Sequence, residues 1–237
     1  MAGKKYRNFL PEKIPKSAMK TTAERKKECT RSRALMHLLR DRLGENSVYG
    51  FAAKYDDLAK KFTSTKLSNK WQPFFNGERP LTATALKLLS ALFPDATMLH
   101  LNGPADLWLS MWGTLNDLRT VIADDLHAWQ SYDVALAEFE AELLLAEHYG
   151  AQLTLQHLTK AVAFHRLHHD FLGLDGAGTC RCVRRCLDDT KVREALTRLA
   201  VLDDISNDLE IVCGAPRANA PVEERWNALE TKLSWIN

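Results

Sequence analysis

The stretch that decides the fold reads KFTSTKLSNKWQPFFNGERPLTATALKLLSA, from Lys61 to Ala91. It begins with a polar, basic run whose only apolar residue between 63 and 70 is Leu67. Three aromatic residues follow at i, i+3 and i+4 spacing: Trp71, Phe74 and Phe75. This spacing places the three rings on one face of a helix, where they would pack into a hydrophobic core.

The second half of the stretch carries the signals of a helix end and a new helix. Asn76 and Gly77 both tolerate a left-handed backbone, so they predict the end of the first helix. Pro80 prevents the helix from continuing at once. Thr82 or Thr84 can cap the next helix. One face of that helix is formed by Leu86, Leu89, Ser90 and Phe93.

Upstream, the chain predicts short helices. A helix begins near Thr21, and its apolar face is formed by Leu35, Leu38, Leu39 and Leu43. Gly44 predicts its end, and Ser47 can cap a second helix over 48–55. We expect a third helical segment, containing Leu58 and Ala59 and capped by Asp56 or Asp57.

Downstream, the patterns become long and helical. Asn102-Gly103-Pro104 predicts a turn, and helical periodicity then covers 114–130, 132–149, 154–172, 190–202 and 222–235. We expect loops at 174–180 and 213–221. No stretch alternates as a half-buried strand does, so the fold class is all-α. The expected organisation is a basic flexible arm over 1–20, a helix-turn-helix-like domain over 21–101, and an α-helical bundle over 105–237.

Charge is distributed unevenly along the 237 residues. Residues 1–42 hold 13 Lys/Arg against 4 Asp/Glu, whereas 101–170 hold 3 against 10. A basic front indicates contact with a polyanion, although basic chain ends are also common as solvated tails. The N-terminus has no apolar segment typical of a secretory signal, and no run of apolar residues predicts a membrane span. We therefore expect a cytoplasmic protein.

Residues 47–95 resemble the Cro/repressor-type helix-turn-helix DNA-binding domain. The parts that match are Leu58-Ala59, Thr65–Lys70, Trp71, Asn76-Gly77, Arg79-Pro80 and Leu86–Leu92. A second register is open, in which Phe51-Ala52 takes the place of Leu58-Ala59 and a longer insertion follows. The chain departs from the family pattern at Thr63-Ser64, where a glycine is usual, and at Pro73, which lies inside the expected recognition helix.

The resemblance implies double-stranded DNA as the partner and assigns roles by position. The expected DNA-facing residues are Lys66, Ser68, Asn69, Lys70 and Gln72, since amide side chains pair with adenine and lysine meets guanine or phosphate. The expected phosphate contacts are Lys60, Lys61 and Arg79. For each of these, an ordinary solvated surface residue is the alternative interpretation.

The cysteines raise a separate question of metal binding. Zinc candidates are Cys180, Cys182, Cys186 and His169. The spacing is not that of a zinc knuckle, and Cys182 and Cys186, four residues apart, also suit the buried face of a helix that starts near Thr179. We expect no cofactor and no metal.

Two functional hypotheses follow from these patterns. The first is a sequence-specific transcriptional regulator that binds DNA as a homodimer through its C-terminal helices. The second is a non-enzymatic adaptor whose acidic helical bundle binds a protein partner. The chain contains none of the common phosphate-loop, nucleophile-elbow or zinc-protease motifs, so an enzyme is the weakest of the three interpretations.

Overall fold

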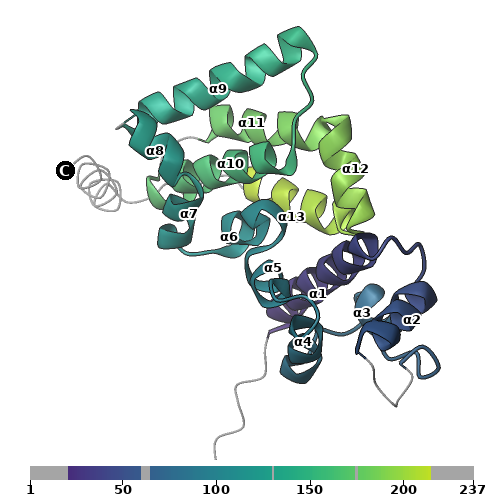
Figure 1. Cartoon of the computed structure of the whole chain (residues 1–237). Helices are drawn as coiled ribbons and strands as arrows, with labels where there is room; N and C mark the ends of the chain where they lie inside the picture. The colour runs from purple at the N-terminus through teal and green to yellow at the C-terminus, as the bar shows by residue number, and fades with distance from the viewer. Residues whose placement is uncertain (1–20, 60–64, 130, 174–175, 215–237) are drawn as a thin grey trace, which may run out of the picture.

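The computed structural model describes residues 21–59, 65–129, 131–173 and 176–214. These residues form helices and turns and no strand, which confirms the all-α fold class (Figure 1). Within them, no helix combines the length and apolar composition that crossing a membrane requires. The predicted arm over 1–20 and the predicted helix over 222–235 lie outside the described residues.

The front of the chain forms one long helix followed by four shorter ones. They are α1 (Thr22–Arg42), α2 (Val48–Ala59), α3 (Gln72–Phe75), α4 (Ala83–Ser90) and α5 (Ala96–Asn102). Thr21 and Glu24 form a capping box at the start of α1, and the Thr82 side chain caps α4 by accepting from the Ala85 amide at 3.1 Å.

The remaining helices form the larger part of the molecule. They are η1 (Pro104–Asp106), α6 (Leu107–Trp112), α7 (Leu115–Val121), α8 (Ala123–Trp129), α9 (Tyr132–Tyr149), α10 (Leu155–Arg166), the π-helical turn η2 (Leu167–Phe171), α11 (Ala177–Asp188), α12 (Thr190–Arg198) and α13 (Leu202–Gly214).

Two hydrophobic clusters organise these helices. The front core comprises Leu35, Met36, Leu39, Phe51, Ala52, Tyr55, Trp71, Phe75, Ala85, Leu89 and Ala96. The back core is built by side chains of α6 to α13, with Phe164 of α10 fully buried at its centre. The division between the cores falls near the predicted domain boundary at 102–104.

Helix α1 belongs to both cores. Its Leu35 and Leu39 lie in the front core, whereas Ala34 lies in the back core and Leu38 packs against both. In Figure 1, α1 runs between the small front helices and the larger group formed by α6 to α13. The two parts of the chain therefore share one long helix instead of being joined only at a linker.

Polar contacts of α1 with α13 reinforce this sharing. Arg33 forms an ion pair with Asp204, and the hydroxyl of Thr30 donates to the same carboxylate at 2.8 Å. Lys26 pairs with Asp208 at 3.2 Å, nearer the N-terminal end of α1. Basic residues of the front thus meet acidic residues of the back within one chain.

Several sequence-based boundaries are wrong in detail. Helix α2 continues through Asp56 and Asp57 to Ala59, so neither aspartate caps a separate helix. The expected helix over 114–130 is divided at Ile122 into α7 and α8. The expected loop over 174–180 gives way to helix α11 at Ala177. Helix α13 runs to Gly214, into the loop expected at 213–221, and the rest of that loop lies outside the described residues.

Burial of α1 gives a first prediction. Replacing the fully buried Leu39 with alanine should lower the free energy of unfolding by about 2–5 kcal/mol, because the methyl groups leave a cavity in the front core. The matched control is Leu58→Ala, at a side chain 51% exposed on α2, which should change stability by less than about 0.5 kcal/mol. Urea unfolding followed by tryptophan fluorescence measures both. Equal losses for the two variants would contradict the assignment of Leu39 to the core.

Candidate nucleic-acid interface

The polar run between α2 and α3 is a turn built on one carboxylate. Asp56, near the end of α2, accepts from the backbone amides of Thr65 at 2.6 Å and Lys66 at 3.2 Å. Its other oxygen accepts from the Thr65 hydroxyl at 2.7 Å. Ser68 closes the turn by donating to the Thr65 carbonyl at 3.1 Å. The main chain at 65–68 is therefore fixed by hydrogen bonds to α2.

Trp71 anchors the other end of this turn in the front core. Its side chain is 1% exposed, and its ring lies edge-on to Phe51 and Tyr55 with centroids 6.0 Å and 5.0 Å away. The indole Nε1–H donates to the Thr65 hydroxyl at 2.9 Å, so the buried nitrogen is satisfied. Thr65 thus connects the Asp56 carboxylate to the aromatic core.

The expected recognition helix is not formed as predicted. Residues 65–71 are a series of turns, and α3 covers only Gln72–Phe75. Asn69 adopts a left-handed backbone, with φ of 48°. Pro73 lies in the first turn of α3, where its missing N–H costs no helical hydrogen bond, so it does not interrupt a helix as expected.

The Asn76-Gly77 turn ends α3, as the sequence indicates. Gly77 has a φ of 69°, and a side-chain carbon at this position would lie 3.0 Å from Nε of Arg33 on α1. The imidazole of His37, also on α1, lies edge-on to Phe75 with centroids 5.2 Å apart. Burial, together with nearby Arg40, lowers the pKa of His37, so the ring is neutral at pH 7. The turn therefore rests directly on α1.

Burial favours the second register of the helix-turn-helix pattern. Phe51 and Ala52 are 0% and 3% exposed, whereas Leu58 is 51% exposed. Phe51-Ala52 is therefore the apolar pair of α2 that packs in the front core, and the expected pattern would fit it only with the longer insertion of the second register. Leu58, the first residue of the other register, lies outside the front core.

Most of the expected DNA-facing residues are exposed in the segment from 65 to 79, whose solvent-exposed side we call the 65–79 surface. Of the expected contacts, Ser68, Asn69, Lys70, Gln72 and Arg79 are exposed and Lys66 is half-buried. Leu67, Asn76 and Glu78 are exposed in the same segment. The ammonium group of Lys70 lies 5.0 Å from the centre of the Trp71 ring, and the Gln72 amide donates to Asn76 at 3.0 Å. Lys60 and Lys61 lie outside the described residues.

The cysteines of α11 diverge instead of converging. The Cys180 thiol donates to the carbonyl of Cys213 at 3.7 Å, and Cys182 donates to Glu140 of α9 at 3.8 Å. Cys186 is fully buried in the back core. The fourth candidate, His169, contacts Asp170 at 3.0 Å. Among the described residues, no three His, Cys, Asp or Glu side chains are grouped closely enough to hold a metal ion.

Sequence reasoning missed the two residues that organise the surface. Asp56 was considered only as a helix cap, and Thr65 only as part of a polar run. The hydrogen bonds of Asp56 span nine residues, so no short-range capping pattern predicts them.

In comparisons with known proteins, no family model, curated protein or solved structure matches the chain.

The role of Thr65 can be tested by removing its hydroxyl. Thr65→Val keeps the shape but leaves the buried Trp71 nitrogen without an acceptor, so it should lower the free energy of unfolding by about 1–3 kcal/mol. Thr84→Val, at an exposed site in α4, is the matched control and should stay within about 0.5 kcal/mol of the wild type. Chemical unfolding measures both, and a blue or red shift in tryptophan emission reports the altered Trp71 environment.

The thiols give a prediction about alkaline pH. Burial raises the pKa of Cys182 to about 11 and that of Cys186 to about 12, whereas the unfolded chain retains a value near 9. A raised folded-state pKa stabilises the fold below pH 9, and this stabilisation is lost as pH rises from 9 towards 11–12. We expect a loss of about 1 kcal/mol per thiol between pH 8 and pH 10. The variant Cys182→Ala/Cys186→Ala should show a smaller loss over this interval in urea unfolding.

Proposed function

We propose that the chain is a DNA-binding transcriptional regulator that presents the 65–79 surface to duplex DNA. One observation carries the proposal: Ser68, Asn69 and Lys70 are exposed on a turn held in place by Asp56 and Trp71, and Gln72 and Arg79 are exposed after it. Amide and hydroxyl groups of this kind read base edges, and lysine and arginine contact phosphates. The aromatic residues beneath them act as scaffold.

The shortness of α3 changes how this surface would meet DNA. A four-residue helix cannot lie along the major groove as a long recognition helix does. The side chains of the preceding turn would enter instead, led by Asn69. Lys70 and Arg79 would bind phosphates on either side, and these contacts set position without specifying sequence.

The second part of the proposal is a homodimer through the C-terminal helices. Helix α9 exposes Val134, Leu145 and Tyr149, whose side chains are 43%, 55% and 76% exposed. Burying such a face against a second copy would bring two 65–79 surfaces to one duplex, which is how dimeric regulators gain affinity.

An adaptor remains the alternative function, and a different observation favours it. The same exposed part of α9 is flanked by Glu138 and Glu142, both exposed, so two copies would bring like charges together. A basic protein partner would suit this face better than a second copy. Whether the chain binds DNA and what binds the exposed face of α9 are therefore two questions, and each needs its own measurement.

Salt dependence tests the DNA proposal. Duplexes selected from a random library by the full chain should bind with affinity that falls steeply between about 50 and 200 mM salt. Replacing Lys70 and Arg79 with alanine should reduce the slope of log affinity against log salt by about 1.8, roughly 0.9 for each phosphate contact. Arg193→Ala, an exposed arginine on α12, is the matched control and should leave the slope unchanged.

Two further variants distinguish side chains that recognise the base sequence from side chains that bind phosphates. Asn69→Gly keeps the left-handed backbone while removing the amide, and Gln72→Ala removes a second amide. Both should lower the preference for the selected site over random duplex by about 1–3 kcal/mol each, with little effect on the salt slope. Absence of any duplex binding by the wild type at about 50 mM salt would refute the DNA proposal and leave the adaptor.

A further inference from the structure

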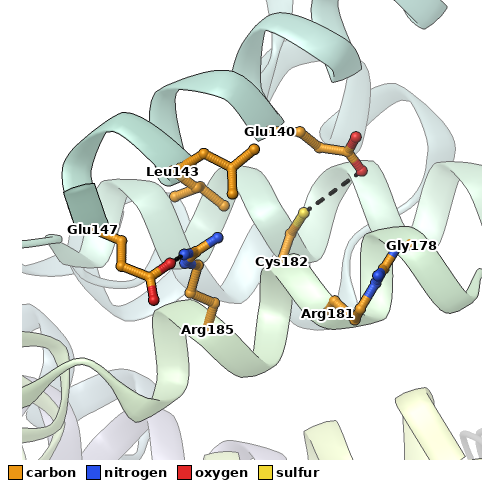
Figure 2. A pocket seen from close by; sticks show the side chains of 8 residues that line it. Glu140, Leu143, Glu147, Gly178, Arg181, Cys182 and Arg185 are labelled. Carbon is orange, nitrogen blue, oxygen red and sulfur yellow. Dashed lines mark hydrogen bonds and ion pairs between the residues drawn. The ribbon is translucent and has the colours of Figure 1, made fainter.

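A groove runs between helices α9 and α11 on the outer side of the back core. It has a volume of about 380 Å³ and is lined by Glu140, Leu143, Leu144, Glu147, Gly178, Arg181, Cys182 and Arg185 (Figure 2). Arg185 pairs with Glu147 at one end, and Cys182 meets Glu140 towards the other. Gly178 has no side chain and leaves the Glu140 end open.

The α9 wall of this groove is apolar at its centre, between Glu140 and Glu147. Leu143 is buried, but the adjacent Leu144 is 58% exposed at the rim. On the other wall Arg181 is exposed, and Arg184 is exposed on the adjoining face of α11; neither forms an ion pair with a described residue. The groove therefore offers an apolar strip beside a basic surface.

The described chain ends close to this groove. The carbonyl of Cys213, at the end of α13, accepts from the thiol of Cys180. On a helix, Cys180 and Cys182 point about 200° apart, so α13 and α9 lie on opposite sides of α11. The Arg181 and Arg184 face of α11 connects these two sides. Residues 215–221 can span about 23 Å when extended, more than the 10–12 Å diameter of a helix.

The sequence beyond this point has the pattern of an amphipathic helix. In VEERWNALETKLSWI, from 222 to 236, one face would carry Val222, Trp226, Leu229, Leu233 and Ile236 at alternating spacings of four and three residues. This face is a narrow seam of the kind that packs on another helix. The segment opens with Glu223 and Glu224, which are complementary in charge to Arg181 and Arg184.

We propose that residues 222–236 form a helix that docks in the α9–α11 groove of the same chain, with Trp226 and Leu229 against Leu143 and Leu144. The acidic start of the segment would lie over the two arginines of α11. The seven-residue connection is long enough for the segment of the same chain to reach the groove. This proposal is independent of DNA binding, because none of its residues belongs to the 65–79 surface.

Paired cysteines test the docking in the full chain. Leu144→Cys with Leu229→Cys should form a disulfide under mild oxidation, and mass spectrometry should find it within a single chain. Leu144→Cys with Asn227→Cys is the matched control, because position 227 lies about 160° from position 229 on a helix. We expect at least about tenfold more cross-link in the first variant than in the control, a difference of about 1.4 kcal/mol in local pairing.

Hydrogen exchange gives a second measurement that needs no cross-link. Leu229→Glu with Leu233→Glu should release the segment, so amides of 140–149 and 178–185 should exchange at least about fivefold faster than in the wild type. Asn227→Glu, on the opposite face, should leave their rates unchanged.

The alternative occupants give distinct results. Cross-linked dimers in place of cross-linked monomers would overturn the proposal and assign the groove to the segment of a second copy. Equal cross-linking at 227 and 229, or exchange rates that do not respond to the glutamates, would show that the segment does not dock there. If the chain failed to bind DNA in the salt experiment, the expected cross-linking and hydrogen-exchange results would not change.

Discussion

The structure depends on the sharing of helix α1 between two cores. Leu35 and Leu39 point into the front core and Ala34 into the back core, so neither core is complete without this helix. The ion pair of Arg33 with Asp204, supported by Thr30, fixes α1 against α13. Because Arg33 also lies against Gly77, the turn that ends α3 takes its position from the same helix. The candidate DNA-facing surface is thus held from behind by contacts that extend into the back of the molecule.

This arrangement changes the meaning of the uneven charge. The sequence places positive charge in the front and negative charge in the middle, which indicates a polyanionic partner. In the structure, Lys26, Arg33 and Arg42 pair with Asp208, Asp204 and Asp95. Much of the described basic charge of α1 is therefore neutralised within the chain. The remaining exposed cations that face away from these pairs include Lys70 and Arg79, so the DNA proposal depends on them and no longer on the net charge of the front.

The sequence predicts helices, their caps and the aromatic core more reliably than it predicts the candidate site. Local patterns suffice for the start of α1 near Thr21, for the Thr82 cap, for the Asn76-Gly77 turn, and for burial of Trp71 and Phe75, since each depends on residues a few positions apart. The turn at 65–71 depends on the Asp56 carboxylate nine residues earlier, and the pairing of α1 with α13 spans more than 170 residues. Helical periodicity carries no information about such distant partners, which explains why the sequence predicts a longer recognition helix than the structure contains.

The hydrogen bonds of Asp56 and Thr65 have a consequence for the thermodynamics of any contact made by the 65–79 surface. Ordering a free loop on binding costs about 1–2 kcal/mol of backbone entropy for each residue fixed. Here that entropy is lost when the chain folds, because the turn is already hydrogen-bonded to α2 and anchored by Trp71. A ligand that meets the exposed side chains need only restrict their rotamers. The loss of conformational entropy on association is therefore small for a surface made of turns, and comparable with that of a helix.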